Sequence, residues 1–171
     1  SFARMPSPNF SVENIRDLVQ QALFMQQVAH SSIEFVSKLP EGSVELMCDR
    51  HQTAQVLTNL LQNAADAINE ARLGEAILPK GRIEVVVADN GSTVSVEISD
   101  NGPGLPVEQR DRLFEPYVTT RTKGTGLGLA IVKKVMEDHS GELFLENSPN
   151  GGACARLVFH REARESPDER A

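Results

Sequence analysis

The residues best suited to chemistry fall in one stretch, residues 100–130, which reads DNGPGLPVEQRDRLFEPYVTTRTKGTGLGLA. Asp100-Asn-Gly-Pro-Gly104 opens it after an alternating strand pattern, and Gly124-Thr-Gly-Leu-Gly128 closes it before an apolar-periodic helix. Closely spaced glycines let backbone amides approach an anion, and a helix N-terminus adds the positive end of its dipole. A carboxylate at one end of a loop and an anion cradle at the other indicate a nucleotide site, although this glycine spacing matches neither the Walker nor the Rossmann pattern.

Asp100 itself has two interpretations, and the sequence leaves both open. Val94, Val96 and Ile98 share one face of the strand predicted at 93–99, and Asp100 has the same parity, so its side chain is expected on the core-facing side. A carboxylate there needs hydrogen-bond donors, and the exocyclic amine of a purine is one. The alternative is that Asp100 only forms an Asx turn with the Asn-Gly that follows it.

A helix predicted over 49–71, beginning at Asp49 or His51, carries a second group of polar residues. Its apolar residues recur at helical period and predict a buried face, which consists of Leu57, Leu60, Leu61, Ala64 and Ile68. The opposite face carries Gln52, Gln55, Asn59, Asn63 and Asp66, of which the last three are three or four residues apart and point the same way. This is either an ordinary solvated face or, because magnesium takes oxygen ligands, part of a site for magnesium and a nucleotide.

The patterns before and after this helix predict the elements that position both groups. A helix is predicted over 11–29, with Ser11 as its N-cap and an apolar stripe of Ile15, Leu18, Val19, Ala22, Phe24 and Met25. Short strands are predicted at 33–39 and 44–48, joined by Pro40-Glu-Gly42, and a loop at 73–81. A hairpin follows at 82–88 and 93–99, closed by a type I′ turn at Asn90-Gly91.

The last third of the chain predicts short helical turns at 107–114, a helix from Gly128 that ends with Gly141 as its cap, and strands at 142–146 and 153–159. The whole order predicts an α+β fold, a two-layer α/β sandwich whose mixed, mostly antiparallel sheet has helices on one face. We expect a connector at 1–10, one domain at 11–160 and a charged, disordered tail at 161–171.

Composition narrows the possible functions. The 171 residues suffice for one domain with a real core, and no apolar run is long enough to cross a bilayer. The net charge of −7 argues against a nucleic-acid surface but not against ATP, which needs only a few local cations and amides. Cys48 and Cys154 are expected to be free thiols, and neither has metal-site spacing. A start at Ser1 without a signal peptide suggests a fragment of a longer protein.

Four blocks in this order resemble the catalytic ATP-binding domain of bacterial sensor histidine kinases, which has the Bergerat fold of the superfamily shared with gyrase B, Hsp90 and MutL. Residues 59–67 (NLLQNAADA) match the N box, 100–104 (DNGPG) the G1 box, 114–120 (FEPYVTT) the F box and 124–129 (GTGLGL) the G2 box. The resemblance covers roughly residues 9–160. The connector residues 2–6 (FARMP) and the F box look most like nitrogen-regulation kinases of the NtrY type.

The resemblance implies roles for these residues. Asp100 would accept the adenine amine, Asn63 would ligate magnesium with Asn59 in support, and Lys123 or Arg121 would reach the terminal phosphates. Asn59, Asn63 and Lys123 are thus the implied catalytic residues. The nucleotide-contacting set comprises Asn59, Asn63, Asp66, Asp100, Gly102, Gly104, Leu105, Phe114, Thr119, Thr120, Arg121, Lys123, Gly124, Thr125, Gly126, Leu127, Gly128 and Leu129. Asp66 stands where many of these kinases have a Lys or Arg, which gives the loop cations more weight.

The implied reaction is transfer of the γ-phosphate of magnesium-ATP to a histidine on a dimerisation hairpin that this sequence lacks, with a response regulator as the later acceptor. His30, His51, His139 and His160 do not match the acceptor motif and are expected to be surface or cap residues. A hydrolytic ATPase is the first alternative, but Asn59 replaces the glutamate of that branch and an amide cannot act as a general base. A nucleotide-sensing module without phosphotransfer is the second, and a serine-directed relative is conceivable.

The same resemblance implies where the domain works. We expect it to be the cytoplasmic portion of a membrane-anchored kinase that makes no direct contact with membrane or nucleic acid. The fragment is expected to be a monomer, and the whole protein a homodimer through the absent hairpin.

Overall fold

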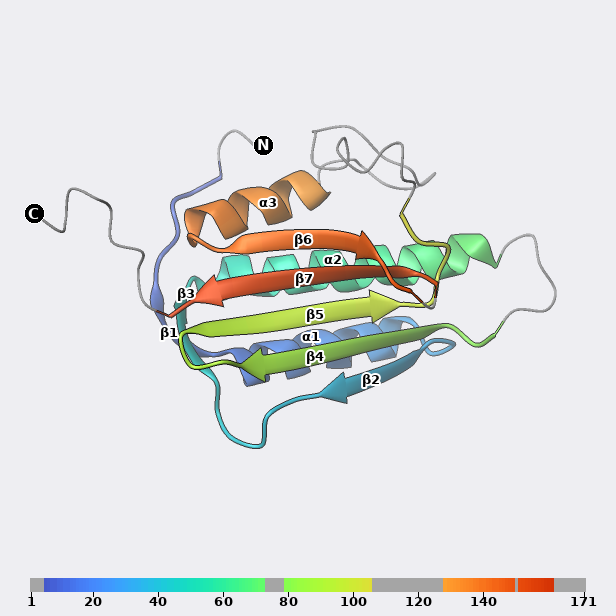
Figure 1. The fold of residues 1–171 in the computed structure, drawn as a ribbon, viewed down its shortest axis with the longest axis horizontal. Coiled ribbons are helices and arrows are strands. Elements are labelled where there is room, and N and C mark those ends of the chain that lie inside the picture. Colours follow the sequence, from blue (N-terminus) through green and yellow to red (C-terminus); the bar gives the residue numbers. More distant parts are fainter. Residues whose placement is uncertain (1–4, 73–78, 106–127, 150, 162–171) are drawn as a thin grey trace, which may run out of the picture.

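The computed structural model describes residues 5–72, 79–105, 128–149 and 151–161 (Figure 1). A five-stranded sheet in the order β2-β4-β5-β7-β6 forms one layer, and three helices cover one of its faces. The strands of this sheet are β2 Glu34–Lys38, β4 Arg82–Asp89, β5 Thr93–Asp100, β6 Glu142–Asn147 and β7 Ala153–His160. The helices are α1 Ile15–Ala29, α2 Arg50–Ala71 and α3 Gly128–Asp138. The predicted two-layer α+β sandwich is therefore confirmed, whereas the helical turns predicted at 107–114 lie outside the described residues.

Strands that follow one another in the sequence were expected to pair, and the observed pairing differs from this. The two strands predicted around Pro40-Glu-Gly42 exist but do not pair with each other. β2 instead pairs with β4 in parallel, and β3 (Glu45–Cys48) pairs antiparallel with β1 (Ser11–Asn14) in a separate ribbon. Parallel neighbours need a long crossover, and α2 supplies it between β2 and β4.

The first helix begins at Ile15, so the prediction of Ser11 as its N-cap is wrong. Asn14 is the cap, because its Oδ1 accepts the backbone N–H of Arg16 at 3.1 Å and that of Val44 at 2.9 Å. Residues 11–14 pair with β3 and cannot also join the helix. The predicted apolar stripe is wrong at two positions: Leu23 and Gln26 are buried at helical period, whereas Phe24 and Met25 are 63% and 65% exposed.

The predicted buried face of α2 is confirmed, since Leu57, Leu60, Leu61, Ala64 and Ile68 all lie in the core. They pack on the inward-facing residues of β4 and β5, which are Ile83, Val85, Val87, Val94, Val96 and Ile98. Gln52, predicted on the polar face, is instead buried, and its Nε2 donates to the carbonyl of Pro6 at 3.0 Å. The chain before β1 is thus tied to the first turn of α2.

Asp49 caps α2 and holds the same N-terminal segment. Its Oδ1 accepts the backbone N–H of Gln52 at 2.8 Å, and its Oδ2 accepts that of Asn9 at 2.7 Å. Burial alone would raise the pKa of Asp49, but hydrogen bonds from the Asn9, Gln52 and His51 amides outweigh it and lower the pKa. The ionised carboxylate is therefore the form that the fold stabilises.

We expect Asp49→Asn to lower the free energy of unfolding at neutral pH by about 1–3 kcal/mol, because the new amide would face the Asn9 N–H donor. A carboxyl whose folded pKa is depressed contributes stability above its unfolded pKa of 3.8, and loses it as the pH falls through the folded value. The gap between wild type and variant should therefore narrow below about pH 4. Urea unfolding across this range measures it, and a gap that does not change with pH would contradict a role for the charge.

His139 joins the end of α3 to the start of α2, which is more than the surface or cap role predicted for it. The backbone N–H of Asp49 donates to His139 Nε2 at 3.0 Å, and His139 Nδ1 lies 2.8 Å from the carbonyl oxygen of Val135. These contacts require the tautomer protonated at Nδ1. The ring of Phe10 meets the imidazole edge-on, with centroids 5.1 Å apart. The imidazole thus links both helix ends to the chain before β1.

The predicted chain reversals are present, but with different central residues. In the β4–β5 hairpin the backbone N–H of Asn90 donates to the carbonyl oxygen of Thr93 at 2.9 Å, so Gly91 and Ser92 are the two central residues of the turn. Only Gly91 has a positive φ, of 85°, and this fits a type II′ turn rather than type I′. At the end of α3 the left-handed residue is Ser140, with φ 55°, and not Gly141.

Glycine is required at position 141 because of a close contact with β7 and not because of a left-handed backbone. A Cβ at Gly141 would lie 2.5 Å from the carbonyl oxygen of Val158, so only glycine permits this approach of α3 to β7. The backbone N–H of Gly141 reaches back to Met136 at 2.8 Å and completes a Schellman motif.

Arg161, assigned to the tail by the sequence, has a defined position. Its guanidinium binds both oxygens of Asp89 at 2.5 and 3.0 Å and the carbonyl oxygen of Glu45 at 3.0 Å. The hydrogen bond from Arg161 lowers the pKa of Asp89 to about 2. Residues 162–171 lie outside the described residues.

Candidate functional site

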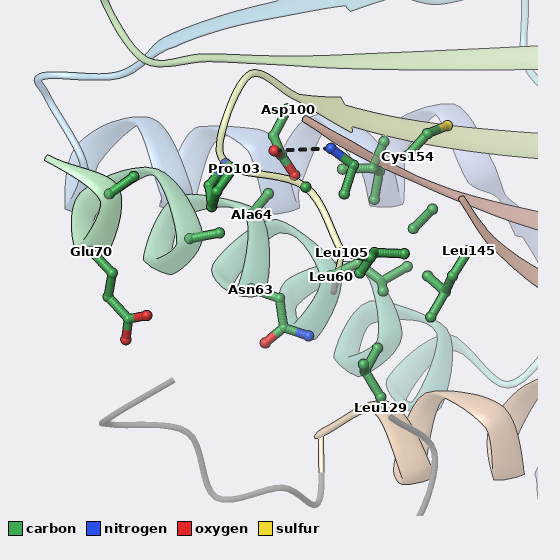
Figure 2. Close-up of a pocket in the computed structure, with 16 residues that line it drawn as sticks. Leu60, Asn63, Ala64, Glu70, Asp100, Pro103, Leu105, Leu129, Leu145 and Cys154 are labelled. Carbon is green, nitrogen blue, oxygen red and sulfur yellow. Dashed lines mark hydrogen bonds between the residues drawn. The ribbon is translucent and has the colours of Figure 1, made fainter. Parts of the chain in front are cut away.

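A cavity of about 520 Å³ lies between α2, the chain that leaves β5, the first turn of α3 and strands β6 and β7 (Figure 2). Its volume is in the range of small-molecule and cofactor sites. Of the predicted site residues that the structure describes, five line it: Asn63, Asp100, Gly104, Leu105 and Leu129. Figure 2 shows Asp100 and Asn63 on different walls, one from the end of β5 and the other from α2.

Asp100 forms the Asx turn of one interpretation, and its position leaves the other, binding of a purine amine, as a prediction. Its Oδ1 accepts the backbone N–H of Gly102 at 2.9 Å, the expected Asx turn, and that of Ala153 at 3.3 Å. The same side chain lines the cavity, and among the described residues no donor bonds its Oδ2. Burial raises the pKa of Asp100 and outweighs the opposing hydrogen bonds from Gly102 and Ala153. A ligand amine in the cavity would supply the donor that Oδ2 lacks.

Helix α2 brings Asn63 to the cavity but not all of its predicted partners. The lining residues Leu60, Asn63, Ala64 and Ala67 recur at helical spacing. Asn59 lies one turn before Asn63 and, like Asp66, is not among the described residues that line the cavity. The carboxylate of Asp66 accepts Gln62 Nε2 at 2.8 Å. Their nucleotide contacts stay predictions.

The two glycines of the 100–104 block have different structural roles. Gly104 adopts φ 87°, a conformation that favours glycine, and a Cβ there would come 2.9 Å from Asn147 Oδ1. Gly102 donates to Asp100 and lines a smaller neighbouring cavity of about 250 Å³. Asn101 accepts the Arg82 N–H and donates to the carbonyl of Lys80, both at 2.8 Å, so it fixes the start of β4.

Strands β6 and β7 contribute cavity residues that sequence reasoning missed, among them Leu145 and Ala153. Sequence reasoning treated 148–152 only as a turn, yet Gly152 has φ 84° and its backbone lies against the carbonyl oxygen of Asp100. Two successive glycines after Pro149-Asn150 were the available signal. Cys154 also borders the cavity, but its sulfur points away from it (Figure 2). Both cysteines are free, as predicted.

Part of the predicted site falls in segments that the structure does not describe. The predicted site residues that lie outside the described residues are Phe114, Thr119, Thr120, Arg121, Lys123, Gly124, Thr125, Gly126 and Leu127. Of the predicted G2 box, Gly128 begins α3 and Leu129 lines the cavity.

The donors present suit a magnesium-bound nucleotide. Within the described residues no group of three or more His, Cys, Asp or Glu side chains could hold a metal alone. Magnesium, however, usually keeps several waters and takes only one or two protein ligands together with substrate phosphates. The amide of Asn63 on the cavity wall fits that mode. In the part of the chain that the structure describes, no helix has the length and hydropathy to span a bilayer.

Comparison with known proteins identifies the family to which this fold belongs. Residues 48–163 match the family described as histidine kinase-, DNA gyrase B- and HSP90-like ATPase, and the chain belongs to this family. The chain is 45% identical over 167 residues to the nitrogen regulation protein NtrY of Azorhizobium caulinodans, and the match covers 95% of this chain but 21% of NtrY.

Solved structures place the chain among the catalytic domains of histidine kinases. The mycobacterial sensor histidine kinase MprB superposes with a TM-score of 0.76 at 25% identity, covering 89% of this chain and 97% of that one. Histidine kinase ThkA in complex with the response regulator TrrA superposes with a TM-score of 0.70 at 28% identity, covering 90% of this chain and 42% of that one. The resemblance inferred from the four blocks is confirmed.

Proposed function

We propose that this domain binds magnesium-ATP and donates the γ-phosphate to a histidine on a dimerisation hairpin joined to it through residues 1–10. A response regulator would then take the phosphate from that histidine. The chain spans about a fifth of the length of NtrY, so these partners belong to the proposal. The observation that carries it is the placement of Asp100 and Asn63 on different walls of one cavity.

The described part of the site supplies three groups to this reaction. Asp100 offers Oδ2 to the adenine amine while its Oδ1 is held by two backbone amides. The Asn63 amide oxygen would hold magnesium, which when bound neutralises phosphate charge. The N-terminus of α3 at Gly128 would place its positive dipole end near the phosphates. Of the predicted phosphate cations, Lys123 and Arg121 remain part of the proposal from the sequence alone.

The chemistry of α2 favours phosphotransfer over hydrolysis. Asn59, at the position of the hydrolytic glutamate, offers no general base that would activate water. ATP should therefore persist until a histidine nitrogen attacks, and catalysis would be mainly positioning and charge stabilisation. The chain with a supplied acceptor hairpin should transfer labelled phosphate to the hairpin histidine. Steady-state release of inorganic phosphate without it would favour the hydrolytic alternative, and nucleotide binding without transfer would favour a sensing module.

We expect Asn63→Ala to remove the contribution of magnesium to ATP affinity, so that titrations with and without magnesium give about the same dissociation constant. Asn63 is a half-buried polar residue at the cavity wall and is not part of the hydrophobic core cluster, so the fold should persist. Calorimetric titration with ADP and a non-hydrolysable ATP analogue measures the effect. Gln55→Ala, at an exposed position of the same helix, is the matched control. Full magnesium dependence in the Asn63 variant would refute the assigned role.

A further inference from the structure

The turn between β6 and β7 holds both ends of the segment 100–105, which forms one wall of the cavity. Figure 1 shows this turn beside the chain that leaves β5. At the first end, Ala153 donates its backbone N–H to Asp100 Oδ1 at 3.3 Å, and Gly152 packs on the Asp100 carbonyl. At the second end the contact comes from Asn147, the last residue of β6.

Asn147 makes a two-point contact with the backbone of Leu105. Its Oδ1 accepts the Leu105 N–H at 2.6 Å, and its Nδ2 lies 3.4 Å from the Leu105 carbonyl oxygen. The two residues are 42 positions apart in the sequence, so the side-chain amide replaces the backbone partner that a neighbouring strand would give. An amide is suited to this, because it carries a donor and an acceptor side by side.

The backbone at Gly104 is shaped for this contact. Its φ of 87° turns the chain. The absence of a Cβ leaves room for Asn147 Oδ1, because a Cβ at this position would lie 2.9 Å from that oxygen. Between the two anchors, Pro103, Gly104 and Leu105 all line the cavity that Asp100 lines (Figure 2). The position of this wall therefore depends on Asn147 at one end as much as on Asp100 at the other.

We propose that Asn147 is a positioning residue for nucleotide binding, which fixes the wall formed by Pro103, Gly104 and Leu105 against the base. It does not touch the nucleotide itself and acts through the Leu105 backbone. This inference rests on the proposed function, because it assumes that the cavity holds the base. Without the Asn147 contact, the wall must be ordered when the ligand binds, and the affinity falls by the cost of that ordering.

The test compares three variants of the 171-residue chain by calorimetric titration with magnesium-ADP. Asn147→Ala loses both hydrogen bonds and should bind about tenfold more weakly. Asn147→Asp keeps an acceptor for the Leu105 N–H but loses the donor to the Leu105 carbonyl oxygen, so its affinity should lie between those of Asn147→Ala and wild type. Asn90→Ala changes an asparagine of the β4–β5 turn, at the opposite end of β5, whose Nδ2 donates to Thr93 Oγ1 at 3.5 Å, and should bind like wild type.

Amide hydrogen exchange separates positioning from general stability. The Leu105 amide should exchange faster in Asn147→Ala and stay protected in Asn147→Asp, while the free energy of unfolding without nucleotide changes little. Wild-type affinity in Asn147→Ala overturns the inference alone, and so does an affinity loss that merely follows a loss of global stability. Failure of the wild-type chain to bind magnesium-ADP overturns the proposed function and this inference together.

Discussion

Replacing Asp100 with asparagine is expected to weaken ATP binding about 10- to 100-fold, the range of one hydrogen bond to a charged group. Oδ1 is bound to the amides of Gly102 and Ala153, so asparagine would keep its oxygen there and turn its NH₂ toward the cavity. The adenine amine would then meet a donor instead of an acceptor. Unchanged ATP affinity would mean that Asp100 is only a turn former.

The same substitution should not weaken the fold at neutral pH. Burial raises the pKa of Asp100 despite the hydrogen bonds from Gly102 and Ala153. A carboxyl whose folded pKa is raised contributes stability below its unfolded pKa, and this is lost as the pH rises through the folded value. At pH 7 the buried charge is a cost that asparagine removes, and this benefit should shrink toward about pH 4.

Titration with magnesium-ADP and urea unfolding at both pH values measure the two effects on one variant. Asp17→Asn, at an exposed position in the first turn of α1, is the control for loss of a carboxylate. A large loss of stability in Asp100→Asn at pH 7 would contradict the inferred cost of burying the charge.

Replacing Gly152 with alanine is expected to lower the free energy of unfolding by about 3 kcal/mol or more, or to displace the β6–β7 turn. The residue has φ 84°, and a Cβ would overlap the carbonyl oxygen of Asp100. Because that clash is with backbone, no side chain can rotate away to relieve it. Displacing the turn would also disturb Ala153 and therefore Asp100, so nucleotide affinity should fall with stability.

The neighbouring glycine provides a matched control. Gly151 has φ 95°, but a Cβ there has nothing within 4 Å. Gly151→Ala should therefore show only the left-handed backbone penalty, about 1–2 kcal/mol. Urea unfolding of both variants isolates the effect of the close approach to Asp100. Equal losses would mean that backbone conformation alone determines the sensitivity of this turn.

Residue periodicity predicted which faces are buried. The alternation of Val94, Val96 and Ile98 placed Asp100 on the helix-covered side, and the helical repeat of α2 identified its core residues, whereas Asn63, predicted on the opposite face, lines the cavity beside Leu60 and Ala64. Both inferences hold because each depends on the local geometry of one element. The four blocks added the family, and with it the expectation that Asp100 and Asn63 contact the same nucleotide.

The sequence could not predict which elements would be neighbours. Periodicity does not state a strand's partner, so the β1–β3 ribbon and the parallel β2–β4 pair were missed. The contact of Asn147 with Leu105 joins residues 42 positions apart, and no local pattern marks it. His139 was taken for a surface or cap residue because its partner, Asp49, is 90 positions away. Such contacts are known only once the chain is folded.

The anchored segment before β1 has a mechanical consequence. Pro6 is held by Gln52, Asn9 by Asp49, and the Phe10 ring by His139, and Met5 packs against the core. A twist of the chain before Met5 would therefore act as a torque on the ends of α2 and α3 and would not be absorbed by free backbone rotation. Farther along these two helices, Asn63 of α2 and Leu129 of α3 form walls of the cavity, so rotation of the helix ends would move these walls.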